Sequence, residues 1–402
     1  MSLEELILSD YGTIPKTIGM FLLKCNSSTY LQIQSATKLS DEDLTDGLSL
    51  LIQRRIVKFF IFEKVYKYSV LKSMIKRRMY FSVYLSYVSQ NYSSKHAKYF
   101  SKIMVNGTFK ETGENMDSET STVVDDLINA GILKIEVFST KTSEMDSCNS
   151  SKQFKPSNKF LTVNFSLLDQ KIFEEETVKY VSRRYNEAAG SVLKALLKCE
   201  SGNRDSIIDN LDSTKVLISD KGSLVNEREN IDEYLKYLCS ANVITQGMDE
   251  RKSYFFGLPK NTLKAYKLSL IIKDSSMRRI FNMILNKPLV EDKDITIRSL
   301  LGINKVKTAL LSLQRLGMIS QRCIGDYTSG SRIEHSWFVD TSHACLSILK
   351  RIEKHICGKL EKINECWTLN YLNEDCMNNY NVWTSDFISL ATDHLVLSYG
   401  LN

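Results

Sequence analysis

The chain has 402 residues and a net charge of +6 at pH 7, with 53 Lys and Arg against 47 Asp and Glu. Its length exceeds that of one ordinary hydrophobic core and predicts two to four domains, while 43% hydrophobic residues exclude a disordered chain. Only 4 Pro and 17 Gly occur, which argues against turn-rich sandwiches and barrels and favours helices with short strands.

The N-terminal residues and the cysteines indicate the compartment. The first residues are acidic and lack a basic segment before an apolar run, so no secretory signal is expected. No stretch approaches about eighteen uncharged apolar residues, and we expect no membrane span. The 9 Cys are dispersed without a C-x-x-C pair, which is typical of reduced thiols in a cytosolic or nuclear protein.

The first module predicted along the chain is a winged helix, in which three helices precede a β-hairpin. Apolar residues at helical spacing predict helices over Ile14–Cys25 and Tyr30–Thr37. Ser40 stands three residues before Asp43, as in a capping box, and predicts the start of the third helix.

The end of that third helix has a register that recurs four times. Two apolar residues three apart lie on one helix face and must be buried, a stop position then requires left-handed backbone, and two apolar residues begin a strand. Gly or Asn occupies the stop in three copies, whereas Arg55 occupies it in the first, which predicts the weakest stop there. The copies are Leu48, Leu51, Arg55, Ile56, Val57; Val124, Leu127, Gly131, Ile132, Leu133; Leu235, Leu238, Asn242, Val243, Ile244; and Leu310, Leu313, Gly317, Met318, Ile319.

The second and third copies contain polar inserts, which we interpret as loops. Gly107–Ser121 and Thr140–Asn158 are rich in Ser, Thr, Glu and Lys. Phe160–Phe165 is predicted to be the strand that closes the second wing. The first helix of the third module is predicted over Tyr180–Lys198, before the polar stretch Cys199–Asp205.

The fourth copy repeats the element order of the first. Helices are predicted over Met277–Leu285 and Asp294–Leu301, and Asn304 is the predicted N-cap of the third helix. The predicted wing pairs Ser320–Cys323 with Ser336–Asp340.

The residues after Asp340 predict a helical hairpin. Apolar residues at near-heptad spacing from Leu346 to Ile363 indicate a long helix. A polar, Asn-rich turn is predicted over Asn370–Asn381, followed by a second helix over Asp386–Tyr399.

The predicted fold class is therefore mainly α with short β-hairpin wings, built from tandem winged-helix (helix-turn-helix) modules and a C-terminal helical hairpin or coiled coil. Four unrelated helix ends are the alternative, and the constant offsets argue against it. The predicted boundaries are residues 1–68, 69–170, 171–273 and 274–340 for the four winged helices and 341–402 for the hairpin.

A strongly basic stretch spans the first wing and the linker after it. Nine Lys and Arg stand there against one acid, Glu63, with five aromatic residues interleaved. Cationic side chains that neutralise phosphates release counterions, and no base-reading signature accompanies them, so sequence-independent nucleic-acid binding is predicted. Two alternatives are a solvated face with the aromatics packed inward and an interface with an acidic partner. The candidate residues are Arg54, Arg55, Lys58, Lys64, Lys67, Lys72, Lys76, Arg77 and Arg78.

The third helices of the first and fourth modules differ in charge. The first begins Asp-Glu-Asp-Leu-Thr-Asp at Asp41, which suits the positive end of the helix dipole but repels phosphate, so this helix is not expected in a major groove. In the fourth module, Lys305 and Lys307 are further candidates for nucleic-acid binding, with a plain exposed helix as the alternative.

No metal, cofactor or catalytic site is predicted. His343, Cys345, His355 and Cys357 form two H-x-C pairs, but residues two apart on one helix point to different faces and cannot converge on zinc. No Gly-rich phosphate loop, G-x-S-x-G or H-E-x-x-H sequence occurs, which predicts a protein that is not an enzyme.

Several segments resemble the large winged-helix subunit of the heterotrimer specific to RNA polymerase III, the family of its third-largest subunit. Residues Leu6–Phe60 resemble the opening winged helix of that family, and Tyr68–Phe81 is similar to its linker into the second module. Leu161–Phe165 is similar to the strand that closes its second domain. Trp337–Asp340 and the helix after it fit its last winged helix and coiled coil.

The resemblance implies a nuclear, non-catalytic subunit of DNA-directed RNA polymerase III. Such a subunit scaffolds the initiation subcomplex beside the clamp, with the polymerase core and two smaller heterotrimer subunits as partners. It has no active site of its own and no membrane association, and it contributes sequence-independent DNA contacts during promoter opening and initiation.

Two other functions are compatible with the residues. A stand-alone winged-helix transcription factor would bind a preferred DNA sequence, although the acidic start of the first recognition helix argues against it. A winged-helix scaffold without nucleic acid would use the basic stretch as a protein interface.

Overall fold

The computed structural model of the chain describes residues 2–110, 118–138, 158–199, 202–211, 227–247, 253–257, 260–287, 289–324, 334–368 and 374–401. The chain divides into two compact units. Unit 1 comprises residues 1–169 and 353–392, and unit 2 comprises residues 170–352 and 393–402. Helices with small antiparallel hairpin sheets make up both units, so the predicted fold class is confirmed.

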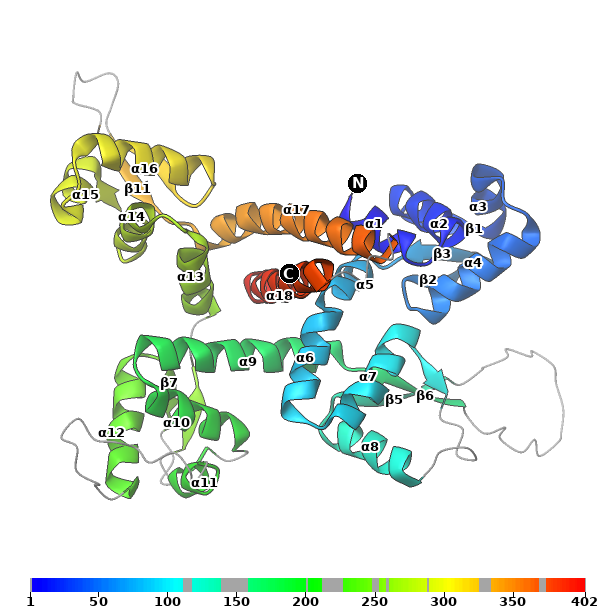
Figure 1. Cartoon of the computed structure of the whole chain (residues 1–402), viewed down its shortest axis with the longest axis horizontal. Coiled ribbons are helices and arrows are strands. Elements are labelled where there is room, and N and C mark those ends of the chain that lie inside the picture. The colour runs from blue at the N-terminus through cyan, green and yellow to red at the C-terminus, as the bar shows by residue number, and fades with distance from the viewer. Residues whose placement is uncertain are drawn as a thin grey trace. The chain divides into compact units, whose positions relative to one another are not determined.

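The first module of unit 1 is a winged helix with a small three-stranded sheet (Figure 1). The strands lie in the order β1-β3-β2 and are antiparallel. As predicted, the Ser40 side chain caps the third helix by accepting a hydrogen bond from the Asp43 amide at 3.1 Å. The elements are α1 (Leu3–Ser9), α2 (Thr13–Lys24), β1 (Ser28–Thr29), α3 (Tyr30–Thr37), α4 (Asp41–Gln53), β2 (Val57–Phe62) and β3 (Val65–Val70).

The second module of unit 1 follows a short linker and has a sheet in the order β4-β6-β5. Part of the predicted loop Gly107–Ser121 is wrong, because it contains β4 and the first turn of α8; residues 111–117 lie outside the described residues. The predicted loop Thr140–Asn158 also lies outside them except for its last residue, which begins β6. The elements are α5 (Lys72–Arg77), η1 (Arg78–Tyr80), α6 (Phe81–Asn91), α7 (Ser94–Asn106), β4 (Phe109–Lys110), α8 (Ser118–Asn129), β5 (Leu133–Phe138) and β6 (Asn158–Val163).

The third module, in unit 2, departs from the single helix predicted over Tyr180–Lys198. A helix that begins in unit 1, α9 (Phe165–Arg184), ends before Asn186, whose side chain accepts a hydrogen bond from the Ala189 amide at 2.8 Å. Asn favours this capping position over a helix interior, and so starts a new helix. The further elements are α10 (Glu187–Lys198), α11 (Arg204–Asp209), α12 (Glu227–Ser240), β7 (Ile244–Gln246), β8 (Tyr254–Phe256) and α13 (Lys260–Ile271).

The fourth module repeats the architecture of the first, with strands in the order β10-β11-β9. The predicted N-cap at Asn304 is wrong: Gly302 holds that position, without a side-chain hydrogen bond, and Asn304 lies in the first turn of the helix. The elements are α14 (Ser275–Leu285), β9 (Val290–Glu291), α15 (Asp292–Ser299), α16 (Ile303–Arg315), β10 (Ser320–Ile324) and β11 (Glu334–Phe338).

Two long helices, α17 (Thr341–Thr368) and α18 (Glu374–Ser398), follow the fourth wing. The predicted Asn-rich turn over Asn370–Asn381 is largely wrong, because α18 already begins at Glu374; residues 369–373 lie outside the described residues. Within unit 1 the two helices are joined by an ion pair of 2.5 Å between Lys359 Nζ and Asp386 Oδ2. The coiled coil stays a prediction.

The left-handed stops and the buried apolar pairs of the four-fold register are confirmed, although the strand begins only at the second residue of the following pair in three copies and directly after that pair, at Ser320, in the fourth. The stop residues Arg55, Gly131, Asn242 and Gly317 all have left-handed backbone, with φ of 59°, 72°, 54° and 73°. At each stop the following amide donates to the carbonyl five residues back, at 2.9–3.0 Å, which is the bond of a Schellman motif. The apolar pairs before and after each stop are at most 4% exposed.

Unit 2 also contains a buried ion cluster. Lys267 on α13 is 9% exposed, and its ammonium group lies 2.6 Å from a carboxylate oxygen of Glu176 and 2.8 Å from one of Asp393. The desolvation of three charges is offset only because each has an opposite partner. The cluster thereby joins three elements of this unit, α9, α13 and the end of α18.

Replacement of Gly317 should destabilise the fourth module. In Gly317→Ala the new methyl group would lie 2.6 Å from Ser347 Oγ at a φ of +73°, so we expect the opening free energy of α16 to fall by about 1–3 kcal/mol. Hydrogen exchange of peptides from α16 measures this change. Gly358→Ala is the control: no atom lies within 4 Å of the new methyl group, and an interior helical Ala should stabilise α17 by about 0.5–1 kcal/mol. Equal effects of the two changes would contradict the conclusion that the stop of the fourth module requires glycine at position 317.

Candidate nucleic-acid interface

The nine basic residues predicted to bind nucleic acid lie on three successive elements of unit 1. Two follow α4, three belong to the β2–β3 hairpin, and four lie on α5 and the start of η1. The structure separates them into five side chains that make contacts within unit 1 and four that remain on the surface.

Arg54 and Arg55 connect the first module to the second. The Arg54 guanidinium donates to the Val105 carbonyl and, at 2.7 Å, to Asn106 Oδ1. The Arg55 guanidinium makes a bidentate ion pair with the Glu136 carboxylate on β5. Because of that bond the pKa of Glu136 is lowered to about 2. Arg55, the stop residue of the first module, therefore also anchors the second module.

The linker arginines and Lys76 are likewise engaged. Lys76 Nζ lies 2.7 Å from a Glu353 carboxylate oxygen on α17, within unit 1. Arg77 lies 3.5 Å from Asp169, which also accepts a 2.5 Å hydrogen bond from the Tyr84 hydroxyl. These contacts attach the linker to its own unit.

Arg78 lies among aromatic rings of unit 1. Its guanidinium carbon is 4.3 Å from the Tyr11 ring centroid and 5.1 Å from that of Phe81, which is the geometry of cation–π contacts. Burial lowers the pKa of Arg78, and burial raises the pKa of Tyr11 to about 12. This arginine packs inside unit 1 and does not form part of a surface patch.

The surface cations are Lys58, Lys64, Lys67 and Lys72. Lys58, Lys64 and Lys72 are exposed and make no ion pair within the described part of the chain. Lys67 is half-buried, and its Nζ lies 4.1 Å from the Phe62 ring centroid. Lys64 forms the tip of the hairpin with Glu63, and both have positive φ, of 65° and 51°. Lys58 thus lies on the edge strand β2, Lys64 at the tip of the hairpin and Lys67 on the central strand β3, whereas Lys72 lies at the start of α5.

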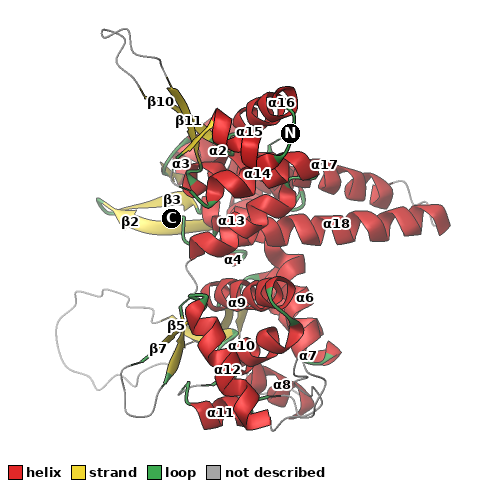
Figure 2. Ribbon diagram, turned by 90° about the vertical axis from the view of Figure 1, so that its left-hand side faces the viewer, coloured by secondary structure: helices red, strands yellow, loops and turns green. Residues whose placement is uncertain are grey.

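The same wing exposes large apolar side chains. Figure 2 shows β2 and β3 as a hairpin that reaches beyond the helices of its module. Phe59, Ile61 and Tyr66 share one face of the ladder, whereas Phe60 and Phe62 share the other with Lys58 and Lys67. The exposed fractions are 54% for Phe59, 38% for Phe60, 64% for Ile61, 48% for Phe62 and 55% for Tyr66. These aromatic side chains do not pack inward. They therefore differ from the alternative of a solvated basic face whose aromatic residues form the core of the wing.

The recognition helices are mostly acidic. The first turn of α4 carries Asp41, Glu42 and Asp43, and Tyr30 donates a 2.8 Å hydrogen bond to the Asp41 carboxylate. Helices α8 and α12 also contain several Asp and Glu, whereas α16 has none. Lys305 and Lys307 are exposed on α16 in unit 2 and make no ion pair among the described residues. Their predicted binding of nucleic acid stays a prediction.

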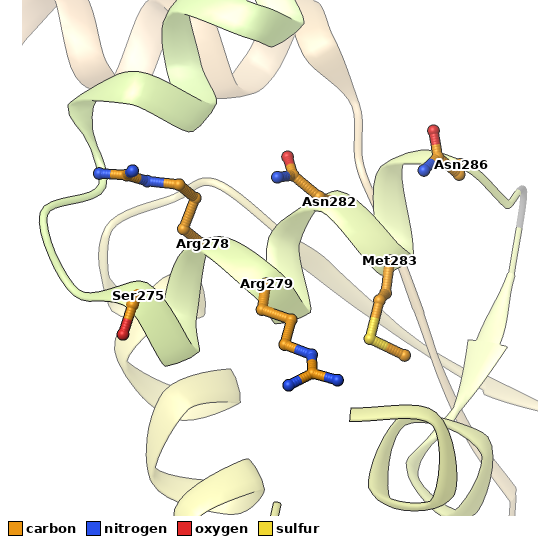
Figure 3. Close-up of a pocket in the computed structure, with 6 residues that line it drawn as sticks. All are labelled: Ser275, Arg278, Arg279, Asn282, Met283 and Asn286. Carbon is orange, nitrogen blue, oxygen red and sulfur yellow. The ribbon is translucent and has the colours of Figure 1, made fainter. Parts of the chain in front are cut away.

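Two depressions lie near these elements. One, of about 860 Å³, is within unit 1 and is lined by both wings, with Phe59 and the Arg55–Glu136 pair among its residues. The other, of about 440 Å³, lies along α14 (Figure 3). Figure 3 shows Arg278 and Asn282 on one side of α14 and Arg279 and Met283 on the other, so these side chains do not converge. Arg278 also donates to the Ile272 carbonyl at 2.7 Å. We therefore assign no site to α14.

The two H-x-C pairs do not form part of a metal cluster within the described residues. His343, Cys345, His355 and Cys357 all lie on α17, and no group of three or more His, Cys, Asp and Glu that could hold a metal ion occurs in the described ranges. Among the helices described, none is long and apolar enough to cross a membrane.

Sequence reasoning did not identify which basic residues make intramolecular contacts. The partners Glu136, Asp169 and Glu353 lie about 80 to 280 positions away along the chain, and no local spacing relates them to their cations. The alternation of aromatics in β2 was visible, but whether a packed neighbour covers them depends on the tertiary structure.

The first module is similar to a domain of a known family. Residues 2–61 match the model of the family described as the RNA polymerase III subunit RPC82 helix-turn-helix domain. The match spans α1 to α4 and all but the last residue of β2. No curated protein matches the chain.

The Arg55–Glu136 pair should make stability depend on pH. Since the pKa of Glu136 is about 2 in the folded chain and 4.5 in its ordinary state, the pair stabilises above about pH 4.5 and loses its effect as the pH falls towards 2. We expect Glu136→Gln to cost about 1–2 kcal/mol at pH 7, since both side chains remain about a quarter exposed, and much less at pH 3. Urea unfolding followed by circular dichroism measures this. Glu42→Gln, at an exposed acid of α4, is the control, and a pH-independent loss in Glu136→Gln would contradict the assignment.

Proposed function

Because the first module matches the family model of the RPC82 helix-turn-helix domain, we propose that the chain is a non-catalytic RPC82-type subunit of RNA polymerase III. It scaffolds the initiation subcomplex beside the clamp and contributes sequence-independent DNA contacts during promoter opening and initiation. The match over residues 2–61 carries this proposal, since it falls on a module with four helices and a wing of its own.

The proposed partners follow from the same family. They are the clamp of the polymerase core and two smaller subunits of the polymerase-specific heterotrimer, and the compartment is the nucleus. The subunit has no active site of its own and works by positioning other components.

The charge on the recognition helices supports a scaffolding role. A helix that reads a major groove presents Arg, Lys, Asn or Gln to the bases, whereas the exposed start of α4 presents Asp41 and Glu42. Arg54, Arg55 and Arg77, which could contact phosphates, are held by contacts within unit 1. These features also argue against a sequence-specific transcription factor.

The wing of the first module is the proposed DNA contact. Lys58, Lys64 and Lys67, followed by Lys72 on α5, offer charge to phosphates, and exposed aromatic rings beside them offer flat surfaces for unpaired bases. Both features suit DNA that is being opened, where duplex and single strands occur together.

Assembly is tested by purifying the full chain through an affinity tag under native conditions. We expect RNA polymerase III subunits to be recovered with it in near-equal amounts, and subunits of the other nuclear polymerases to be absent. Recovery of the chain as a free monomer would overturn the proposal.

The DNA contact is tested by paired charge reversals in the first module. For Lys58→Glu with Lys64→Glu, we expect at least about a tenfold weaker binding of a random-sequence DNA bubble at low salt, and a salt slope reduced by about 2, because two phosphate contacts are lost. Fluorescence anisotropy measures both quantities. Lys24→Glu with Lys38→Glu is the control, because it changes the charge of the same module equally away from the wing. Unchanged binding by the wing variant would favour a scaffold without nucleic acid.

A further inference from the structure

The turn between α15 and α16 in the fourth module exposes three large apolar side chains. Ile297 is 71% exposed, Leu300 is 83% exposed and Ile303 is 57% exposed. They lie within seven residues of one another, at the end of one helix, in the turn and at the start of the next. A contiguous apolar cluster on a surface is typical of an interaction site.

The first module provides an internal comparison for this turn. Helices α3 and α15 both have 8 residues, α4 and α16 both have 13, and three residues separate the helices of each pair. The first residue of both turns has left-handed backbone, with φ of 56° at Lys38 and 53° at Leu300. Each position of one pair therefore has a direct counterpart in the other.

At the three counterpart positions the first module has polar residues. Ser35 corresponds to Ile297, Lys38 to Leu300 and Asp41 to Ile303. Because the same helix–turn–helix forms with Ser, Lys and Asp, the fold does not require apolar side chains there. The buried positions behave differently, since Leu44 and Leu48 correspond to Val306 and Leu310 and stay apolar in both modules.

Leu300 is unfavourable in its own position. Left-handed backbone suits Gly or Asn, whereas a bulky side chain clashes with the adjacent carbonyl. Leu at this position, with its side chain 83% exposed, is favourable neither for the backbone nor for burial within the module. A partner that covers this side chain would account for it.

A groove beside the cluster has both apolar and positively charged walls. It has a volume of about 310 Å³ between α15 and α16, and Ile297, Ile303, Val306 and Leu310 line it. Lys293 and Lys307 lie at its edges, are exposed and make no ion pair with any described residue. The acid in the groove, Asp292, accepts a hydrogen bond from the Trp337 indole of its own module.

We propose that this groove, with Ile297 and Ile303 in its walls and Leu300 in the turn between its two helices, binds an apolar-faced acidic helix of another protein. A groove between two helices with an apolar floor of Val306 and Leu310 suits a helix that inserts apolar side chains from one face, at i, i+3 and i+7. The two lysines without ion pairs select acidic flanks and orient the helix. Nucleic acid is the poorer occupant, because phosphates gain nothing from three exposed aliphatic side chains. The proposal is independent of the DNA contact assigned to the first wing.

The position of the partner is tested with the assembled complex. The full chain, alone and in the complex recovered through its tag, is oxidised with hydroxyl radicals, and the side-chain labelling is measured by mass spectrometry. We expect labelling of Ile297, Leu300 and Ile303 to fall at least fivefold in the complex. Leu311, exposed on the same helix but outside the groove, is the reference. A p-benzoylphenylalanine at position 300 then identifies the covering segment by photo-crosslinking.

The chemistry of the contact is tested with the crosslinked segment as a synthetic peptide. We expect the triple variant Ile297→Ser, Leu300→Lys, Ile303→Asp to bind the peptide with a Kd at least tenfold higher than that of the unchanged chain. The variant should keep its fold, because the first module carries these three residues at the counterpart positions. Leu311→Ser, which matches Ser49 of the first module, should stay within twofold. Leu300→Asn should raise the Tm by about 2 °C and still weaken binding, whereas a purely structural Leu300 would give a lower Tm.

Four results would overturn the proposal: equal labelling in both states, a crosslink to DNA, a crosslink to a second copy of the chain, or a covering segment without acidic flanks. The charge-reversed wing variant Lys58→Glu with Lys64→Glu should retain the peptide. A protected groove in a chain that binds no polymerase would contradict the proposed function alone.

Discussion

Each winged helix in this chain depends on one backbone reversal, in which the helix that precedes the wing ends in a left-handed residue. The reversal returns the chain onto the helix that it has just left, so that the last apolar pair of the helix and the first pair of the strand meet in one core. A backbone that continued as helix or left in another direction would expose both pairs to water. All four modules share this geometry, although the residue in the reversal differs.

The first module shows how a less suitable residue is accommodated there. Arg55 lacks the conformational freedom of Gly, but its side chain extends from the reversal to Glu136 in the second module. The backbone cost is offset by an ion pair that Gly could not form. Arg54 and Arg77 are used similarly, which explains why a stretch that is so basic in sequence has only four cations on its surface. Most of the charge in this stretch therefore serves contacts within unit 1.

Repetition of one fold gives surfaces of different chemistry because the core positions are constrained and the others are not. The helix before the wing begins with exposed acids in the first module and with an exposed Ile beside lysines in the fourth. The two helices nevertheless have the same length and follow turns of the same length. The first wing adds exposed aromatics among lysines. Modules of one fold with such different surfaces would not compete for a single kind of ligand.

From the residues alone, the end of the helix before each wing could be predicted, because local spacing and left-handed stops act over a few neighbouring positions. The Asn186 cap was missed because one polar side chain starts a new helix inside a stretch with helical spacing. The start of α18 was missed because an Asn-rich sequence favours a turn, although the chain is helical from Glu374. The site was predicted only in part: the nine cations were found, but the partners of Arg55, Lys76 and Arg77 lie far along the chain, and only the tertiary structure brings them together. The sequence by itself determined the module and its repetition. The fold in space decided which charges are internal and which apolar side chains remain uncovered, because burial depends on neighbours that local sequence does not specify.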